Sequence, residues 1–298
     1  MSRIWILAAA LALHGPIVHG KEMDRAAVAG GELEYEVRGE GEPVLLIHGA
    51  HVAVAFVPLM NQSALDDYQL IRYRRRGYAD SAPAQGPLEE YIAGAAADAA
   101  ALLDLLEIDR AHVVGHSAGG VIALQLAIDR PERVGSLALL EPALLMVPSA
   151  EKLGEKLQPA VDHYEAGEPA AGVDAFMSVV AGTEWRDLVS AEVPGGVAQA
   201  KADAATFFEL ELSAVAAWEF DESKVGAIDH PVLYLWGGES GVVMSVEDIY
   251  REGRDHVKSW FPQTEEHYIE GINHALQMQE PQAVAEGIAE FLKRHPLP

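Results

Sequence analysis

The stretch "AHVVGHSAGGVIALQLAIDRP", residues 111–131, decides the fold class of this chain. An apolar run ends at a G-x-S-x-G pattern, and an apolar helical pattern begins directly after it and stops at Pro131. The pattern alone arises by chance in about one protein in ten of this length. Between a strand and a helix, it is typical of a sharp turn that holds a serine hydroxyl at a helix N-terminus. We therefore interpret Ser117 as a nucleophile, with a glycine-rich packing turn as the alternative.

Strands and helices alternate on both sides of this turn. Further strand patterns are "PVLLIHGA" (43–50), "YQLIRYRRRG" (68–77), "VGSLALLEP" (134–142), "HPVLYLWGG" (230–238) and "EEHYIEG" (265–271), and helical patterns cover 91–108, 246–260 and 280–294. The alternation predicts an α/β fold with a mostly parallel, doubly wound sheet. Before it, "GELEYEVRGEG" (31–41) alternates polar and apolar residues and ends in glycines, which predicts an edge hairpin.

The alternation breaks at Pro142 and resumes at residue 230. We therefore expect an α/β core over 23–141 and 230–298, with residues 142–229 inserted between strands 6 and 7 as a helical cap. The insertion is rich in aromatic residues that either line a substrate pocket or pack the cap itself. These residues are Phe176, Phe207, Phe208, Trp218 and Phe220.

Composition excludes several classes of function. Among 298 residues, 46 Asp and Glu outweigh 21 Lys and Arg, for a formal charge of −25. Such a surface repels nucleic acid and anionic membranes, so we expect neither as a partner. The charge does not by itself identify a substrate, and a monomer and a homodimer both stay open. The chain has no cysteine, which rules out disulfides, thiolate zinc sites and cysteine nucleophiles.

Residues 1–22 allow two interpretations. Arg3 precedes a short apolar stretch over 4–13, as in a secretory signal, which would place the protein in the periplasm or outside the cell. Alternatively the natural start is Met23 and the preceding residues are a mis-assigned extension of a cytoplasmic protein. The apolar stretch is too short to span a bilayer as a helix.

Two further strand ends carry residues that suit acyl chemistry. His274, in "EGINHALQMQEP" (270–281), follows the last strand, where a neutral imidazole can take the serine proton and return it to a leaving group. In "IHGAH" (47–51), the backbone N–H of Ala50 is placed to stabilise an oxyanion together with that of Ala118. A metal site on the two histidines of this stretch is the competing interpretation, but no third ligand is near them in the sequence, so we expect no metal.

These three stretches, in this order and at these strand ends, resemble the α/β-hydrolase fold family. The resemblance covers the chain from about residue 30 to its end and is most detailed with cap-containing bacterial serine hydrolases. It implies a cofactor-independent enzyme that cleaves an ester, a lactone or a similar acyl compound. Hydrolysis of carbon–carbon bonds and perhydrolysis on the same residues stay open, as does a small-molecule binding module with little turnover.

The carboxylate that orients the histidine is less obvious. In most of the family it follows the seventh strand in a Gly-x-x-Asp turn, but here Ser240 stands at that position. Glu239 lies one residue early, in a glycine-rich turn where a glutamate is usually solvated. Glu141 directly follows the sixth strand, from which some family members take their acid. We predict Glu141 as the acid and keep Glu239 as the alternative.

The basic stretch "RYRRRGYADS" occupies the place where the family often carries D-x-R-G-x-G-x-S. Arg74 stands where that aspartate would be. We expect Arg76 either to brace loops by pairing carboxylates or to belong to a solvated basic face, and assign it no part in substrate binding.

Overall fold

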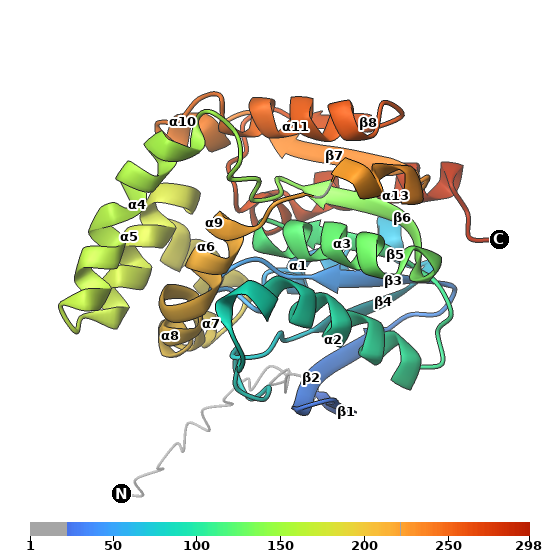
Figure 1. Cartoon of the computed structure of the whole chain (residues 1–298), viewed down its shortest axis with the longest axis horizontal. Helices are drawn as coiled ribbons and strands as arrows, with labels where there is room; N and C mark the ends of the chain where they lie inside the picture. Colours follow the sequence, from blue (N-terminus) through green and yellow to red (C-terminus); the bar gives the residue numbers. More distant parts are fainter. Residues whose placement is uncertain (1–22, 221) are drawn as a thin grey trace, which may run out of the picture.

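The computed structural model describes residues 23–220 and 222–298 and contains one eight-stranded sheet (Figure 1). The leader or extension predicted over residues 1–22 lies outside the described residues. The strands are β1 (Asp24–Val28), β2 (Gly31–Arg38), β3 (Glu42–Ile47), β4 (Tyr68–Tyr73), β5 (Ala111–His116), β6 (Val134–Leu140), β7 (Val232–Gly237) and β8 (Glu265–Ile269). Their order is β1-β2-β4-β3-β5-β6-β7-β8, and all neighbouring pairs are parallel except β1–β2 and β2–β4.

Both faces of the sheet are covered, which explains why its central strands are mostly apolar. Leu45 and Ile47 of β3 pack on one face with α2 (Tyr91–Leu105), α3 (Ala118–Asp129) and α11 (Ile249–Trp260). Val44 and Leu46 of the same strand pack on the other face with α1 (Val57–Met60) and α13 (Pro281–Arg294). The side chains of a strand alternate between faces, so a strand buried on both sides has few polar positions. The buried polar pair His112 and Ser136, on β5 and β6, is satisfied by a hydrogen bond of 2.7 Å.

The edge hairpin predicted over residues 31–41 is only partly right: residues 31–38 form its inner strand, and its other strand precedes them in the chain. Strand β2 pairs with β1 through a two-residue loop and with β4 on its other side, so it lies one strand in from the edge. The glycines that follow it, Gly39 and Gly41, have positive φ and turn the chain into β3 instead. Strand β1, "DRAAV", is five residues long and largely exposed, and so lacks the alternation that marks a half-buried strand.

A group of helices lies between β6 and β7, and we call these helices the cap. They are α4 (Ala150–Glu165), α5 (Pro169–Ala181), α6 (Trp185–Glu192), α7 (Gly196–Ala202), α8 (Ala204–Thr206), the π-helical turn η4 (Phe207–Glu211) and α9 (Leu212–Ala217). Leu153, Val173 and Met177 of the cap share one hydrophobic cluster with Val52 and Met244 of the core. In Figure 1 the cap lies to one side of the sheet, toward the carboxyl ends of the parallel strands.

Short elements complete the connections around the sheet. They are the 3-10 turns η1 (Ser63–Leu65), η2 (Leu88–Glu90), η3 (Pro131–Arg133) and η5 (Glu222–Ala227) and the helices α10 (Ser240–Met244) and α12 (Leu276–Gln279). After β7, the structure has helix α10 where the sequence predicts a turn. The helix predicted over 246–260 begins at Ile249.

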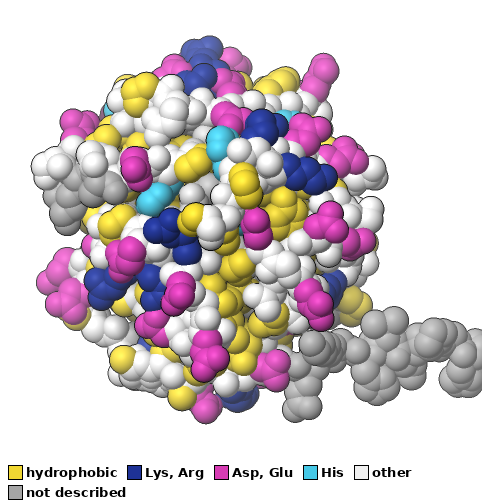
Figure 2. Space-filling model, turned by 90° about the vertical axis from the view of Figure 1, so that its right-hand side faces the viewer, with side chains coloured by type: hydrophobic (Ala, Val, Ile, Leu, Met, Phe, Trp, Pro, Cys, Tyr) yellow, Lys and Arg dark blue, Asp and Glu magenta, His cyan; other side chains and the backbone are white. Residues whose placement is uncertain are grey.

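The surface carries mixed charge. In Figure 2, acidic side chains are scattered over the visible face with basic side chains among them, and no broad basic area gathers there. Among residues 23–220 and 222–298, no helix is both long and apolar enough to cross a membrane.

Candidate active site

Ser117 lies at the sharp turn between β5 and α3. Its backbone, at φ 54° and ψ −123°, is in a region that non-glycine residues avoid and that is held only by surrounding structure. Glycines on both sides permit the close approach that this turn requires. A Cβ on Gly115 would lie 2.4 Å from the carbonyl oxygen of Gly119, and one on Gly119 would lie 2.1 Å from that of Ile47. The serine therefore stands at the N-terminus of α3, facing the cap.

The loop after β3 runs against this serine. A Cβ on Gly49 would lie 2.9 Å from the Cβ of Ser117, so only glycine allows the contact. No hydrogen-bond partner of the Ala50 N–H occurs in the described part of the chain. Ala118 is the first residue of α3, where a backbone N–H has no intrahelical acceptor. Both alanines line the same cavity as Ser117.

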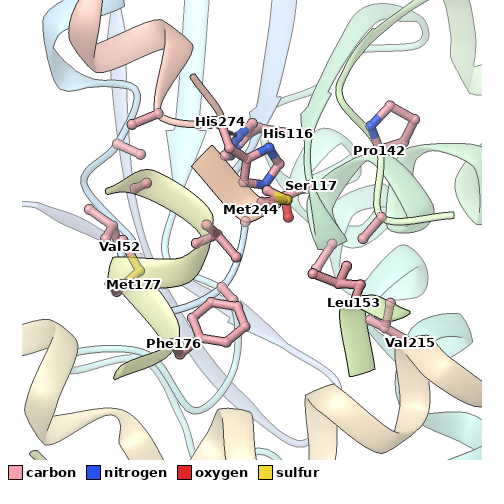
Figure 3. Close-up of a pocket in the computed structure, with 18 of the residues that line it drawn as sticks. Val52, His116, Ser117, Pro142, Leu153, Phe176, Met177, Val215, Met244 and His274 are labelled. Carbon is pink, nitrogen blue, oxygen red and sulfur yellow. Dashed lines mark hydrogen bonds between the residues drawn. The ribbon is translucent and has the colours of Figure 1, made fainter. Parts of the chain in front are cut away.

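His274 lies in the loop between β8 and α12 and is fixed by three neighbours. Its Nδ1 is 2.7 Å from Oε2 of Glu141 and 2.8 Å from the hydroxyl of Tyr250, whose ring stacks on the imidazole. The carbonyl oxygen of His274 accepts a hydrogen bond of 2.8 Å from Nε2 of His116. The ring is thus held from its Nδ1 side. Ser117 and His274 line one cavity (Figure 3), although no hydrogen bond joins their side chains among the described residues.

Glu141, directly after β6, is fully buried and has the unusual φ of 42°. Its Oε2 faces His274, while its Oε1 accepts hydrogen bonds from the N–H of Gly237 (2.8 Å) and the hydroxyl of Ser240 (2.7 Å). The residue at the usual position of the family's acid therefore supports a carboxylate that comes from the neighbouring strand.

Glu239 is not brought to the histidine. It is exposed and precedes α10, and its backbone N–H donates to the carbonyl of Ile272. In the described residues, its carboxylate has no hydrogen-bond or ion-pair partner. This geometry is that of a solvated turn residue.

The cavity above Ser117 is small and mostly apolar, with a volume of about 100 Å³. In Figure 3, Phe176, Met177 and Leu153 of the cap face Ser117 across it. Of the five aromatic residues noted in the insertion, Phe176 and Phe207 line the cavity. The other three pack elsewhere: Phe208 stacks on Tyr164, Trp218 contacts Phe220, and Phe220 stacks on Trp260.

Comparison with known proteins agrees with this architecture. A family model described as the alpha/beta hydrolase fold matches residues 42–172. An enol-lactonase from Burkholderia xenovorans superimposes with a TM-score of 0.69 over 91% of this chain and all of its own, at 21% identity. An esterase from Thermogutta terrifontis gives 0.70 over 92% of this chain and 98% of its own, also at 21% identity. The chain has the α/β-hydrolase fold. The fold class and the family resemblance predicted from the sequence are confirmed.

Among curated relatives of this chain, the esterase YbfF of Escherichia coli is 24% identical over 255 residues, which are 84% of this chain and 92% of that protein. Two RutD proteins, from Azorhizobium caulinodans and Variovorax paradoxus, are 34% and 40% identical over shorter regions. The matched regions span only 43% and 41% of the length of the RutD proteins.

Burial sets the protonation states of the site. It lowers the pKa of His274 to about 3, so the imidazole is neutral near pH 7 and able to accept a proton. Burial raises the pKa of Glu141 to about 7, opposed by the hydrogen bonds from Gly237 and Ser240, which lower it. Because these two groups share a hydrogen bond, they titrate as a pair rather than as independent sites.

Three consecutive arginines follow β4, and the middle one differs from the other two in its contacts. Arg74 pairs with Glu34 at 2.6 Å, and Arg76 pairs with Asp98 at 2.6 Å, so both brace loops through carboxylates. Arg75 instead turns inward, to the loop beside Ser117. No pattern in the sequence distinguishes Arg75 from its neighbours, and none marks Tyr250 on α11 as a partner of the histidine.

The metal interpretation of His48 and His51 finds no support in the described residues. The Nδ1 of His48 donates to the carbonyl oxygen of Gly49 (2.7 Å), and its Nε2 accepts the N–H of Arg75 (3.1 Å). His51 is enclosed by Phe176, Phe207 and Phe208. In the described part of the chain, no group of three or more His, Asp or Glu side chains is placed to hold a metal ion.

Buried histidines predict acid sensitivity. Burial lowers the pKa of His51 to about 4 and those of His116 and His274 to about 3. Unfolded histidines titrate near 6.5, so below that pH the unfolded state binds protons that the folded state excludes. Each group then reduces the free energy of unfolding by up to about 1.4 kcal/mol per pH unit. Within the coupled Glu141–His274 pair, the raised pKa of Glu141 and the lowered pKa of His274 act on stability in opposite directions. The expected loss of stability therefore comes mainly from His51 and His116.

We expect the midpoint of urea unfolding to fall steadily between pH 7 and pH 5. Replacing His51 by Phe should flatten this dependence. Equal midpoints at pH 7 and pH 5 for the unmodified protein would contradict the prediction.

Proposed function

We propose that this protein is a serine hydrolase that cleaves a carboxylic ester or lactone through an acyl-enzyme. One observation carries the proposal. A buried carboxylate, Glu141, contacts Nδ1 of His274 at 2.7 Å, and this histidine shares a cavity with Ser117 at a strained strand–helix turn. A fully buried carboxylate–imidazole contact of this kind suits a base that must become charged during the reaction.

In the proposed mechanism, the hydroxyl of Ser117 attacks the acyl carbon and gives its proton to Nε2 of His274. The carboxylate of Glu141 keeps the other imidazole proton on Nδ1 and stabilises the imidazolium that forms. The N–H groups of Ala50 and Ala118 stabilise the negative oxygen of the tetrahedral intermediate. His274 then protonates the leaving alcohol, and a water molecule, activated by the same imidazole, releases the acid.

The shape and lining of the cavity favour a small acyl substrate. Its wall is formed mostly by apolar side chains, among them Leu157, Phe176 and Met244, and it encloses about 100 Å³. A short or compact apolar group fits such a space, whereas a long chain requires the cap to move. The similarity to an esterase and to an enol-lactonase supports an ester or lactone as the bond that is cleaved.

A fluorophosphonate probe tests this function directly. We expect it to modify Ser117 stoichiometrically, as read by mass spectrometry of the labelled peptide, and to abolish hydrolysis of p-nitrophenyl acetate. Esters with longer acyl chains should be hydrolysed with lower kcat/KM. A protein that is neither labelled nor active on any short activated ester would contradict the proposal and favour a binding module with little turnover.

A further inference from the structure

One buried ion pair joins the cap to the core beside the cavity, whose lining includes Glu211. Nη1 of Arg75 lies 2.5 Å from Oε2 of Glu211, and the two side chains are 2% and 0% exposed. Glu211 belongs to the π-helical turn η4 of the cap, a rare conformation that often occurs at functional sites. Tyr91 of α2 donates a second hydrogen bond of 2.9 Å to the same carboxylate oxygen. The cap is thus anchored to the core at a buried point.

The same guanidinium also bonds the loop beside the nucleophile. Nη2 of Arg75 donates to the carbonyl oxygen of Gly49 at 2.9 Å. That oxygen accepts a second hydrogen bond from Nδ1 of His48 at 2.7 Å. The backbone N–H of Arg75 donates to Nε2 of His48, which leaves the ring proton of the neutral imidazole on Nδ1. Arg75 therefore holds the Gly49 carbonyl both directly and through His48.

Holding this carbonyl also holds the next N–H. A trans peptide is planar, so the C=O of Gly49 and the N–H of Ala50 point in opposite directions from one rigid unit. No cis peptide bond occurs in the described residues. With the carbonyl bound on the side of Arg75 and His48, the N–H is directed away from them. Hydrogen bonds to the carbonyl also polarise the peptide and strengthen its N–H as a donor.

We infer that Arg75 is a positioning residue for the oxyanion donor Ala50, and that Glu211 of the cap keeps Arg75 in place. One ion pair then sets both the docking of the cap and the orientation of the oxyanion hole. The inference rests on the proposed function, because an oxyanion hole matters only if the protein forms a tetrahedral intermediate.

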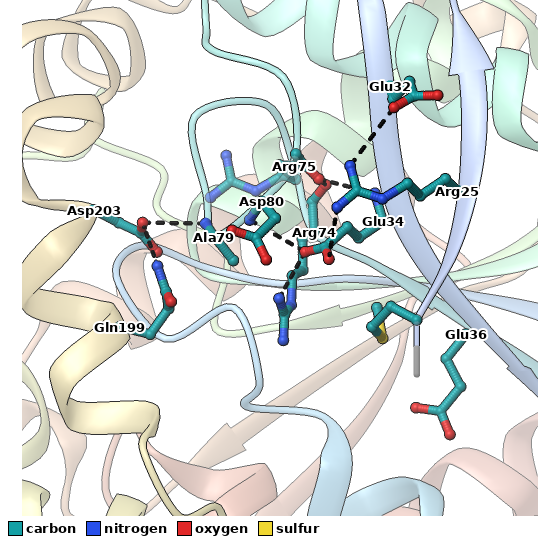
Figure 4. Close-up of polar contacts among 12 residues, drawn as sticks. Arg25, Glu32, Glu34, Glu36, Arg74, Arg75, Ala79, Asp80, Gln199 and Asp203 are labelled. Atoms are coloured by element: carbon teal, nitrogen blue, oxygen red, sulfur yellow. Dashed lines mark hydrogen bonds and ion pairs between the residues drawn. The ribbon is translucent and has the colours of Figure 1, made fainter. Parts of the chain in front are cut away.

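Other contacts keep the cap and the arginine loop in place when this pair is removed. Arg74 pairs with Glu34, and the N–H of Ala79 donates to Asp203 of the cap at 3.1 Å (Figure 4). Arg76 pairs with Asp98 through two hydrogen bonds and touches neither the Gly49 carbonyl nor the cavity. Arg76 directly follows Arg75 in the same loop, so the Arg76–Asp98 pair offers a matched control.

The test compares two double variants. Arg75→Met/Glu211→Gln removes the pair without leaving an unpaired buried charge, which would itself be strongly destabilising. Arg76→Met/Asp98→Asn removes the control pair. Active sites are counted by fluorophosphonate titration, and kcat is expressed per titrated site. We expect the first variant to lose about 10- to 100-fold in kcat with KM changed less than about threefold, and the control to lose less than about threefold.

A second readout isolates the oxyanion hole from folding. A trifluoromethyl ketone that forms a hemiketal with Ser117 places an anionic oxygen in the hole, so its affinity should weaken by about the same factor as kcat. If the first double variant does not fold, Arg75→Lys takes its place. Lysine keeps a charge beside Glu211, but its single nitrogen cannot also bind the Gly49 carbonyl in the same geometry, so kcat should fall while stability is retained.

The outcomes separate the two proposals. Unchanged kcat per titrated site, equal losses in the test and control variants, or unchanged ketone affinity would overturn the role of Arg75 while leaving the hydrolase intact. An unmodified protein that is neither labelled nor active would overturn the proposed function and this inference together.

Discussion

Replacing Ser117 by alanine should lower kcat/KM on p-nitrophenyl acetate by about 10⁵- to 10⁶-fold. The substitution removes only the hydroxyl at the turn after β5. The residual rate should come from the oxyanion donors and from substrate binding, because both remain. Steady-state kinetics at pH 8, corrected for the uncatalysed reaction, measures the loss.

The fold should survive this change, because alanine has no larger side chain and the backbone hydrogen bonds of Ser117 to Leu140 and Ala143 are kept. Circular dichroism and the urea midpoint provide the control. The variant should also take up no fluorophosphonate. Retention of more than about one hundredth of the activity would show that another residue is the nucleophile and would contradict the proposed function.

Glu141→Gln should lower kcat/KM by about 10³- to 10⁴-fold. The amide oxygen can still accept from Gly237 and Ser240, so the buried side chain stays in place. Its NH₂ group then faces Nδ1 of His274 as a donor, which favours the tautomer with the proton on Nε2. That tautomer cannot accept the proton of Ser117.

Glu239→Gln is the matched control, because it makes the same chemical change in the alternative acid. Glu239 is exposed and does not contact His274, so kcat/KM should change less than about threefold. The two variants are compared on the same ester across pH 6 to 9. A large loss for Glu239→Gln with a small loss for Glu141→Gln would overturn the assignment of the acid.

The geometry of neighbouring strands explains how a carboxylate that follows β6 reaches His274. Strands β6 and β7 are parallel and directly paired, so their carboxyl ends lie side by side at one edge of the sheet. Adjacent strands are about 4.8 Å apart, a distance that the longer glutamate side chain can bridge. Ser240, in the place of the usual aspartate, then has a carboxylate oxygen of Glu141 within hydrogen-bond reach. An aspartate at position 240 would instead bring a second negative charge to that oxygen.

The local sequence determined the fold class and the residues at the strand ends. The sequence signals for these features each span only a few residues. They are the apolar runs of β3, β5, β6 and β7 and the glycines on both sides of Ser117. Local position also made Glu141 a candidate acid, as a carboxylate directly after a strand next to that of the serine. Strand β1 was missed for the same reason, because five mostly exposed residues carry no periodic signal.

Only the tertiary structure decided which side chains surround these strand ends. Arg75 and Glu211 are 136 positions apart, and Tyr250 reaches His274 from a helix that shows only an ordinary amphipathic pattern. Nothing in "RYRRRG" tells which arginine turns inward, because the choice depends on a carboxylate supplied by the cap and on the carbonyl of Gly49. Periodicity and turn chemistry act between neighbours in the chain and are therefore visible in the sequence. The pairing of buried charges depends on distances in space, which arise only when the cap has packed on the sheet.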